Sequence, residues 1–307
     1  MKIAILGATG YIGRSLVYEL SLETKDDIFL FGRSRKKLND LLKIIVNKKS
    51  FKANNFDKFK NFKYDVVINC VGIGNPAEMN KSGFKIFEIT EKFDNLVLNY
   101  LKKNPECIYI NLSSGAAYGK KIEKPVKNET YSSININKLD QGDNYTISKI
   151  NSEAKHRILS EFNIVDLRVF SFFSRFIELG PGYLISDIII SIKNKSVLLT
   201  APEDIVRDYV NPSDLLNLIK LLIKKKNINE VFDVYTLKPV SKFELLNYLK
   251  KKYGLRFEIK KSSVLSSPTG LKNAYYSNNK KAKDIGYKPT MTSLQGIERE
   301  IISVIKK

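Results

Sequence analysis

Short apolar runs that alternate with helical patterns dominate the first part of this chain. Six runs have the length and continuity of buried strands, at residues 2–8, 27–32, 50–55, 64–72, 106–114 and 165–170. Apolar residues at helical spacing lie between them, at 15–21, 34–47 and 85–103. Strands that are apolar on both faces are typical of parallel sheets covered by helices on both sides. With right-handed crossovers, this alternation predicts a Rossmann-type doubly wound α/β fold.

The pattern changes after residue 170, where the expected elements become shorter. Candidate strands and helices follow at 196–200, 212–223, 229–236, 241–251 and 255–261. A chain of 307 residues is long enough for one large domain and a smaller lobe. We therefore expect a cofactor-binding domain at 1–170 and a smaller α/β substrate lobe at 171–307, with some chain crossing back and a cleft between the two.

Cysteine content and apolar run length bear on where the protein works. Its two cysteines, Cys70 and Cys107, lie in apolar runs, which argues against a disulfide framework and fits a reducing compartment. The first residues form a strand and turn rather than a signal peptide. The apolar stretch at 183–192 contains Asp187 and is too short to span a bilayer. We expect a cytoplasmic protein without membrane insertion.

The net charge of +20 raises the question of an anionic partner. The lysines are scattered along the chain, and no basic stripe interleaved with aromatic residues appears. We therefore expect no nucleic-acid partner. A basic protein does suit an anionic small substrate.

A glycine-rich turn, "GATGYIG" at residues 7–13, joins the first strand to the first helix. Gly7 allows the tight turn, Gly10 lets the backbone approach a pyrophosphate, and Gly13 lets the helix pack closely on the strand. The helix N-terminus then presents free N–H groups to the pyrophosphate. A glycine turn without a ligand is the alternative. The residues of this turn assigned to the cofactor are Gly7, Thr9, Gly10, Tyr11, Ile12 and Gly13.

The end of the second strand indicates which dinucleotide binds. An NAD site usually has an acidic residue there, on the ribose 2′-hydroxyl, but this chain has Arg33 and Ser34. A guanidinium group can pair with a 2′-phosphate in a bidentate manner. Arg14, just after the turn, can assist. We predict NADP(H), with NAD(H) as a possible cofactor and a solvated Arg33 as the alternative.

Tyr145 and Lys149 lie four residues apart in a segment with helical spacing, so they share one helix face. An ammonium group one turn away stabilises a phenolate, so such a pair can transfer a proton. Ser114 ends the fifth strand, at the edge where open α/β sheets bind ligands. We predict that Ser114, Tyr145 and Lys149 form the catalytic group.

Taken together, these motifs resemble the extended short-chain dehydrogenase/reductases, the NAD(P)-dependent nucleotide-sugar epimerase/dehydratase family. "GATGYIG" looks like its cofactor turn, "SSGAAYG" (113–119) like its serine loop and "YTISK" (145–149) like its tyrosine–lysine motif. "LRVFSFF" (167–173) looks like the strand that leads to the sugar-nucleotide site, and "VRDYVNPSDL" (206–215) like the phosphate-contacting turn. The resemblance runs nearly end to end.

The resemblance implies a role for each site residue. Tyr145 is the acid/base, Lys149 orients it and holds the nicotinamide ribose, and Ser114 polarises the sugar oxygen. Arg207 contacts the nucleotide diphosphate, with an ion pair to Asp204 or Asp208 as the alternative. The further residues that it places at the ligands are Asn55 and Val71 for the cofactor, and Ser113, Tyr118 and Ser171 for the substrate. Tyr118 can equally be a packing residue.

Two of these positions depart from the family pattern. Asn55 stands where an aspartate commonly contacts adenine, and Ser171 where many members have an asparagine beside the substrate phosphate. The resemblance further implies a nucleotide-diphosphate sugar as substrate. It also implies a homodimer built from the helices near 80–103 and 142–162.

The serine loop separates the reactions of this family. Members that dehydrate look like Thr-Asp-Glu where this chain has Ser114, Gly115 and Ala116, so the two acids of that reaction are missing. A reductase that uses NADPH on a nucleotide-linked 4-keto-6-deoxy sugar fits best. A 4-epimerase is the alternative, and a non-catalytic NADP sensor the third reading.

His156 is the only histidine of the chain and lies in a charged segment about three turns beyond Tyr145. We expect it at the surface, solvated or partly buried, without a catalytic role. No Cys/His cluster has the spacing of a metal site, so we expect no metal.

Overall fold

The computed structural model describes residues 1–23, 25–74, 82–119, 122–180, 183–225, 227–260 and 273–306. A seven-stranded parallel sheet forms its centre, in the order β11-β6-β5-β4-β1-β2-β3. The strand order reverses between β1 and β4, which is the point where doubly wound sheets bind ligands. The Rossmann-type prediction is confirmed. The strands are β1 (Lys2–Leu6), β2 (Asp27–Phe31), β3 (Phe51–Asn54), β4 (Val66–Asn69), β5 (Ile108–Ser114), β6 (Ile164–Val169) and β11 (Asn229–Val234).

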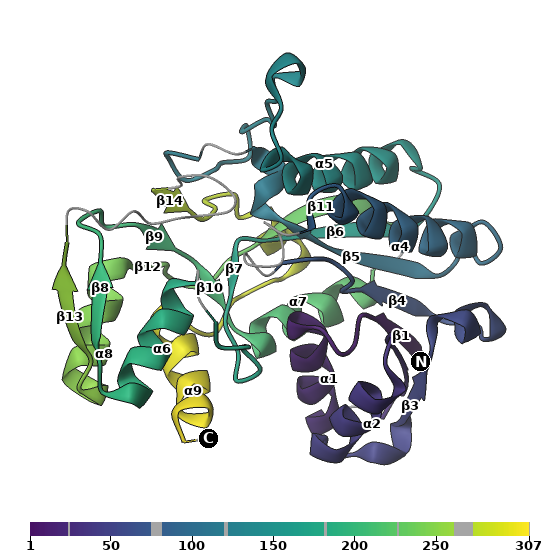
Figure 1. The fold of residues 1–307 in the computed structure, drawn as a ribbon. Coiled ribbons are helices and arrows are strands. Elements are labelled where there is room, and N and C mark those ends of the chain that lie inside the picture. The colour runs from purple at the N-terminus through teal and green to yellow at the C-terminus, as the bar shows by residue number, and fades with distance from the viewer. Residues whose placement is uncertain are drawn as a thin grey trace.

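Helices cover both faces of this sheet (Figure 1). One face packs against α1 (Tyr11–Glu23), α2 (Arg35–Ile44) and α7 (Pro212–Ile223), and the other against α4 (Lys85–Leu101) and α5 (Asp143–Ile158). Side chains of β1 alternate between the two apolar cores, with Ile5 in the first and Leu6 in the second. Each such buried side chain contributes about 1.5–3 kcal/mol, and burial on both sides explains why the strands are continuously apolar.

The smaller lobe lies beside the carboxyl edge of the large sheet and has its own apolar core. Helix α9 packs there against α6, and α6 is formed by the apolar stretch at 183–192. In its described residues the lobe also contains the small sheets β10-β7, β12-β9-β14 and β13-β8. Its elements are β7 (Ser171–Phe172), α6 (Leu184–Asn194), β8 (Val197–Thr200), β9 (Val206–Arg207), β10 (Tyr209–Val210), β12 (Val240–Ser241), α8 (Lys242–Tyr253), β13 (Arg256–Ile259), β14 (Ala274–Tyr275) and α9 (Ser293–Ile305).

The chain returns to the large sheet after entering the smaller lobe. Strand β11 pairs with β6 at the sheet edge, and α7 packs against α1. Strand β11 is thus part of the large sheet, and α7 covers one of its faces, although both follow residue 170 in the sequence. The domain boundary at residue 170 remains a prediction. Short 3-10 turns link the elements, at η1 (Lys48–Ser50), η2 (Phe56–Asn61), η3 (Gly115–Tyr118), η4 (Ile136–Lys138) and η5 (Lys281–Ile285).

The position of His156, the only histidine, differs from the one expected from the sequence. His156 lies on α5 with none of its side chain exposed, between two buried carboxylates. Its Nε2 is 2.7 Å from Oδ1 of Asp94, and its Nδ1 is 2.9 Å from Oδ1 of Asp166. The expectation of a surface histidine was wrong because acidic residues on α4 and β6, far away in sequence, provide its partners.

Over the described ranges, no helix is both long and apolar enough to cross a membrane.

Candidate active site

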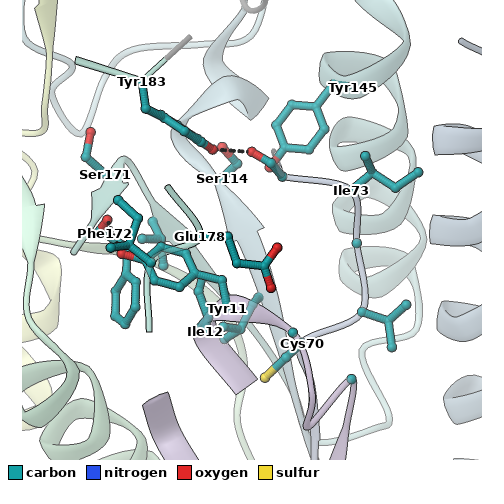
Figure 2. Close-up of a pocket in the computed structure, with 18 of the residues that line it drawn as sticks. Tyr11, Ile12, Cys70, Ile73, Ser114, Tyr145, Ser171, Phe172, Glu178 and Tyr183 are labelled. Carbon is teal, nitrogen blue, oxygen red and sulfur yellow. Dashed lines mark hydrogen bonds between the residues drawn. The ribbon is translucent and has the colours of Figure 1, made fainter. Parts of the chain in front are cut away.

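A cavity of about 2090 Å³ opens at the carboxyl edge of the large sheet, and residues of both lobes line it (Figure 2). Ligand pockets usually measure about 300–1,000 Å³, so this one has room for two ligands side by side. The ends of β1, β2, β4 and β5 reach it from the sheet, and α6, β8 and β9 reach it from the smaller lobe. Its position at the reversal of the strand order is the one expected for a dinucleotide.

The glycine-rich turn forms one wall of the cavity. Gly7 has φ +74° and its backbone touches the end of β4, since a Cβ there would lie 3.0 Å from the carbonyl carbon of Cys70. A Cβ on Gly13 would lie 2.2 Å from the carbonyl oxygen of Gly7. Only glycine fits either position, and the resulting cradle at the N-terminus of α1 fits a pyrophosphate. The turn residues that line the cavity are Gly7, Thr9, Gly10, Tyr11 and Ile12, whereas Gly13 acts through close packing.

Tyr11 also joins this turn to the smaller lobe. Its hydroxyl accepts a hydrogen bond of 2.8 Å from the backbone N–H of Ser174. Its ring meets that of Phe172 edge to face, with centroids 5.3 Å apart (Figure 2). Tyr11 is therefore both a cavity residue and a fixed contact between the lobes.

The end of β2 places Arg33, Ser34 and Lys37 on the cavity wall. Ser34 caps α2, because its hydroxyl accepts a hydrogen bond of 3.3 Å from the N–H of Lys37. Lys37 was not predicted from the sequence, although a residue one turn into the helix can reach the same side. Together these residues form a cationic wall where the sequence lacks an acid.

Two neighbouring arginines point elsewhere. Arg35 donates to the carbonyl oxygen of Ala53. Arg14 makes an ion pair of 2.8 Å with Glu178 and donates to the carbonyl oxygen of Phe176 at 3.3 Å. The expected help of Arg14 at a 2′-phosphate is therefore not supported, because its guanidinium group bridges the lobes instead.

The predicted adenine contact at Asn55 gains no support from the structure. Asn55 is exposed and is not part of the cavity wall, whereas Phe56 and Asp57 are. Val71, at the end of β4, lines the cavity as expected, and its N–H donates to Oδ1 of Asn69 at 3.1 Å.

Ser114, Tyr145 and Lys149 line the same cavity, although β5 and α5 supply them from distant parts of the chain. Lys149 is buried, and its ammonium group donates to the carbonyl oxygen of Leu112 at 3.0 Å. Its Nζ lies 5.7 Å from the centroid of the Tyr145 ring. Figure 2 shows Tyr145 and Ser114 directed into the same region of the cavity. A phenol, an ammonium group and a second hydroxyl therefore line one region of the cavity, and a set of this kind can transfer a proton to an oxygen.

The two adjacent serines of β5 have different surroundings, because successive strand residues point to opposite faces. The hydroxyl of Ser113 donates to Oε1 of Glu153 on α5 at 2.5 Å, and Glu153 pairs with Arg168. The hydroxyl of Ser114 accepts a hydrogen bond from the N–H of Ala116 and lies 3.2 Å from the hydroxyl of Tyr275. Ser113 reaches the cavity wall, but its hydroxyl is occupied by Glu153, so the predicted substrate contact gains no support from that group.

Tyr118 packs behind the serine loop, away from the cavity. Its hydroxyl donates to the buried carboxylate of Asp233 at 2.9 Å, and the guanidinium carbon of Arg168 lies 4.3 Å from its ring centroid. Burial raises the pKa of Tyr118 to about 12, so the phenol keeps its proton for this bond. Tyr118 is therefore a packing residue, and its predicted substrate contact gains no support.

Ser171 and Arg207 line the smaller-lobe side of the cavity. Burial lowers the pKa of Arg207, and its guanidinium group donates to the carbonyl oxygen of Val206 at 2.9 Å. Asp204 and Asp208, the carboxylates expected as alternative ion-pair partners of Arg207, accept hydrogen bonds from other groups. Asp204 accepts from the N–H of Phe243, and Asp208 accepts from Thr236 and Ser293.

Two tyrosines of the smaller lobe were missed by sequence reasoning. Tyr275 contacts Ser114, and Tyr183 donates to the carbonyl oxygen of Gly74 at 2.5 Å across the cavity (Figure 2). Neither lies in a motif, and each is more than 100 residues from the group it meets. Within the described part of the chain, no three His, Cys, Asp or Glu residues gather in a way that could hold a metal ion.

A parallel sheet of this order, with a glycine-rich cradle opening onto a serine, a tyrosine and a lysine, defines the class of short-chain dehydrogenase/reductases in their extended form. The sequence pattern of the NAD dependent epimerase/dehydratase family matches residues 3–236, and the chain belongs to that family. No curated protein sequence matches the chain significantly.

Solved structures share this fold over the whole chain. The dTDP-glucose 4,6-dehydratase of Bacillus anthracis, in complex with NAD, is 17% identical with a TM-score of 0.81, covering 100% of this chain and 97% of its own. The UDP-glucose 4-epimerase of Bifidobacterium longum, in complex with NAD⁺ and UDP, is 19% identical with a TM-score of 0.80, covering 100% and 98%. The UDP-glucuronic acid 4-epimerase of Bacillus cereus, in complex with UDP-glucuronic acid and NAD, is 20% identical with a TM-score of 0.77, covering 100% and 99%. At these identities the likeness concerns the fold.

Proposed function

We propose that this protein reduces a nucleotide-linked 4-keto-6-deoxy sugar, using NADPH. The observation that carries the choice of reaction is the packing at Gly115. A Cβ on this residue would lie 2.4 Å from Cδ1 of Phe170, so a carboxylate side chain has no room there. The neighbouring position is Ala116, which is fully buried. Dehydration by acids in the serine loop is thereby disfavoured, and a reaction that needs one proton donor is favoured.

In this proposal, Tyr145 donates a proton to the carbonyl oxygen of the sugar while Ser114 hydrogen-bonds the same oxygen. Lys149, anchored on the carbonyl oxygen of Leu112, supports the charge that develops on the phenol. A bound NADPH supplies the hydride to the carbonyl carbon. The chain's own contribution is therefore to place one oxygen between two hydroxyls next to a fixed ammonium group.

The cofactor preference rests on the cationic wall at the end of β2. Arg33 and Lys37 line the cavity there, and Ser34 adds a hydroxyl. A 2′-phosphate carries negative charge that two cations can neutralise. NAD binding by the structural relatives is a property of those proteins. A reductase consumes NADPH in each turnover and must exchange it, so a preference for NADPH favours a reductase over an epimerase.

The substrate's diphosphate is proposed to meet Arg207, a cationic residue that lines the smaller-lobe side of the cavity. Ser171 lies on the same side of the cavity and adds a hydroxyl. A homodimer built from α4 and α5 remains a prediction of the family resemblance.

A 4-epimerase is the second candidate. Two of the relatives described above are 4-epimerases, and the same serine, tyrosine and lysine would serve a reversible hydride transfer. Such an enzyme would interconvert a 4-hydroxy sugar without consuming added cofactor.

The test is NADPH oxidation with a panel of nucleotide-linked 4-keto-6-deoxy sugars. Oxidation that depends on Tyr145, and that Tyr145→Phe abolishes while NADPH still binds, supports the proposal. Interconversion of a 4-hydroxy sugar, without oxidation of NADPH by any keto sugar, would favour the epimerase. NADPH binding with neither reaction would indicate a sensor.

A further inference from the structure

Tyr275 reaches the catalytic serine from the far end of the chain. Its hydroxyl lies 3.2 Å from Oγ of Ser114, and it lines the cavity. Its ring packs against Phe170, with centroids 5.1 Å apart, and the residue is 8% exposed. The contact is therefore a buried one between the smaller lobe and the serine loop.

The hydrogen-bonding capacity of Ser114 makes this contact informative. A serine hydroxyl has one hydrogen to donate and two lone pairs that accept. The N–H of Ala116 donates to Oγ of Ser114 at 3.2 Å, which occupies one lone pair. If Tyr275 donates to the second lone pair, the single hydrogen of Ser114 is left for a third partner in the cavity.

We propose that Tyr275 is a positioning residue that donates to Ser114 and so directs the hydroxyl hydrogen of Ser114 at the substrate oxygen. The inference rests on the proposed function of the site, in which that oxygen is a sugar carbonyl. The opposite arrangement, in which Ser114 donates to Tyr275, would leave Ser114 with only a lone pair to offer to an oxygen that itself accepts. Neither Ser114 nor Tyr275 loses its proton, since the transferred proton comes from Tyr145.

Tyr275 keeps the proton that a donor needs. Burial raises the pKa of its phenol, and this effect outweighs the lowering by the hydrogen bond with Ser114. The phenol therefore remains a donor throughout the range in which an enzyme works.

The backbone around Tyr275 is held on two sides. Strand β14 pairs with β9 in a register that sets Tyr275 opposite Arg207. The N–H of Val206 donates to the carbonyl oxygen of Asn273 at 2.8 Å. On the other side, the N–H of Val126 donates to the carbonyl oxygen of Tyr276 at 3.2 Å. A fixed strand can hold a donor within the narrow geometry that a hydrogen bond requires.

The first experiment compares Tyr275→Phe with the wild type. This change removes one hydroxyl and keeps the ring on Phe170. We expect kcat to fall about tenfold, as for the loss of one hydrogen bond in a transition state, while KM for the sugar nucleotide and the affinity for NADPH change little. Tyr276→Phe is the matched control and should leave kcat unchanged. A rise in KM at constant kcat would overturn the inference, because it would make Tyr275 a substrate-binding residue.

A double-mutant cycle with Ser114→Ala gives the decisive readout. If Tyr275 acts through Ser114, adding Tyr275→Phe to Ser114→Ala causes no further loss of kcat. If the two losses multiply, Tyr275 acts independently and the inference fails while the proposed function stands. The kcat values are measured in the reaction that the wild type catalyses, either reduction or epimerisation. A wild type that turns over none of these sugars would refute the proposed function, and this inference with it.

Discussion

The ring of Phe170 occupies the space that any side chain at Gly115 would need, because a Cβ there would lie 2.4 Å from Cδ1 of that ring. The two residues come from the end of β6 and the serine loop after β5, which are adjacent in the sheet. The packing of Phe170 thus leaves no room for an acidic side chain at position 115 of the serine loop.

Gly115→Ala should lower the free energy of unfolding by about 1–3 kcal/mol, because the added methyl group overpacks the contact with Phe170. Urea denaturation measures this effect. Gly180→Ala is the matched control, since no atom of the described residues beyond its chain neighbours lies within 4 Å of its Cβ position. Adding Phe170→Leu to Gly115→Ala should recover part of the loss. An unchanged stability of Gly115→Ala would contradict the packing argument.

Ser113→Ala and Ser114→Ala should differ in their effect on kcat. Ser113 hydrogen-bonds the buried Glu153, so its loss should cost about 1–3 kcal/mol of stability, with kcat nearly retained. Ser114 lines the cavity and accepts a hydrogen bond from the N–H of Ala116, so its loss should lower kcat about tenfold or more and also cost about 1–3 kcal/mol of stability. Parallel measurements of unfolding and turnover check both, and equal losses of kcat in the two variants would count against the assignment.

Arg33→Ala should weaken NADPH binding about tenfold or more and leave NADH binding nearly unchanged, since a charge-assisted contact to the 2′-phosphate is lost. Titration of both cofactors by fluorescence or calorimetry tests this. Arg35→Ala is the matched control, because Arg35 donates to the backbone of Ala53. Equal weakening of NADPH and NADH would argue against a 2′-phosphate site.

His156 should make stability depend on pH above neutrality. Burial lowers its pKa, but Asp166 and Asp94 outweigh that effect and raise the pKa from 6.5 to about 9. Because the pKa is raised in the folded state, the stabilisation is complete below pH 6.5 and is lost as the pH rises through about 9. A shift of this size corresponds to about 3 kcal/mol.

Urea unfolding of the wild type between pH 6 and 10 measures that slope, and His156→Gln should remove it. The variant should also lose about 3–5 kcal/mol near neutral pH, because two buried carboxylates lose their shared partner. A wild type whose stability stays flat across this range would show that His156 carries no extra proton in the folded state.

The fold and the positions of the proposed catalytic residues follow from local features of the sequence. Apolar continuity predicts the parallel sheet, since strands buried on two faces tolerate few polar residues. The turn from Gly7 to Gly13 predicts the cradle, because the steric demand lies within seven residues. The spacing of Tyr145 and Lys149 predicts a shared helix face, since helix geometry is local.

Tertiary packing decided the environment of these groups. Ser113 and Ser114 are adjacent in sequence, yet Glu153 binds one and Tyr275 the other. Tyr118 belongs to the serine loop, but Asp233 from β11 draws its hydroxyl away from the cavity.

The same holds for His156, whose burial depends on Asp94 and Asp166 from two other elements. Tyr275 lies 161 residues from the serine that it contacts. Local sequence thus determines which backbone shapes are present and which residue types it can bring to the cavity. The direction of each hydroxyl and the proton affinity of each buried group depend on partners that only the folded chain brings within hydrogen-bonding distance.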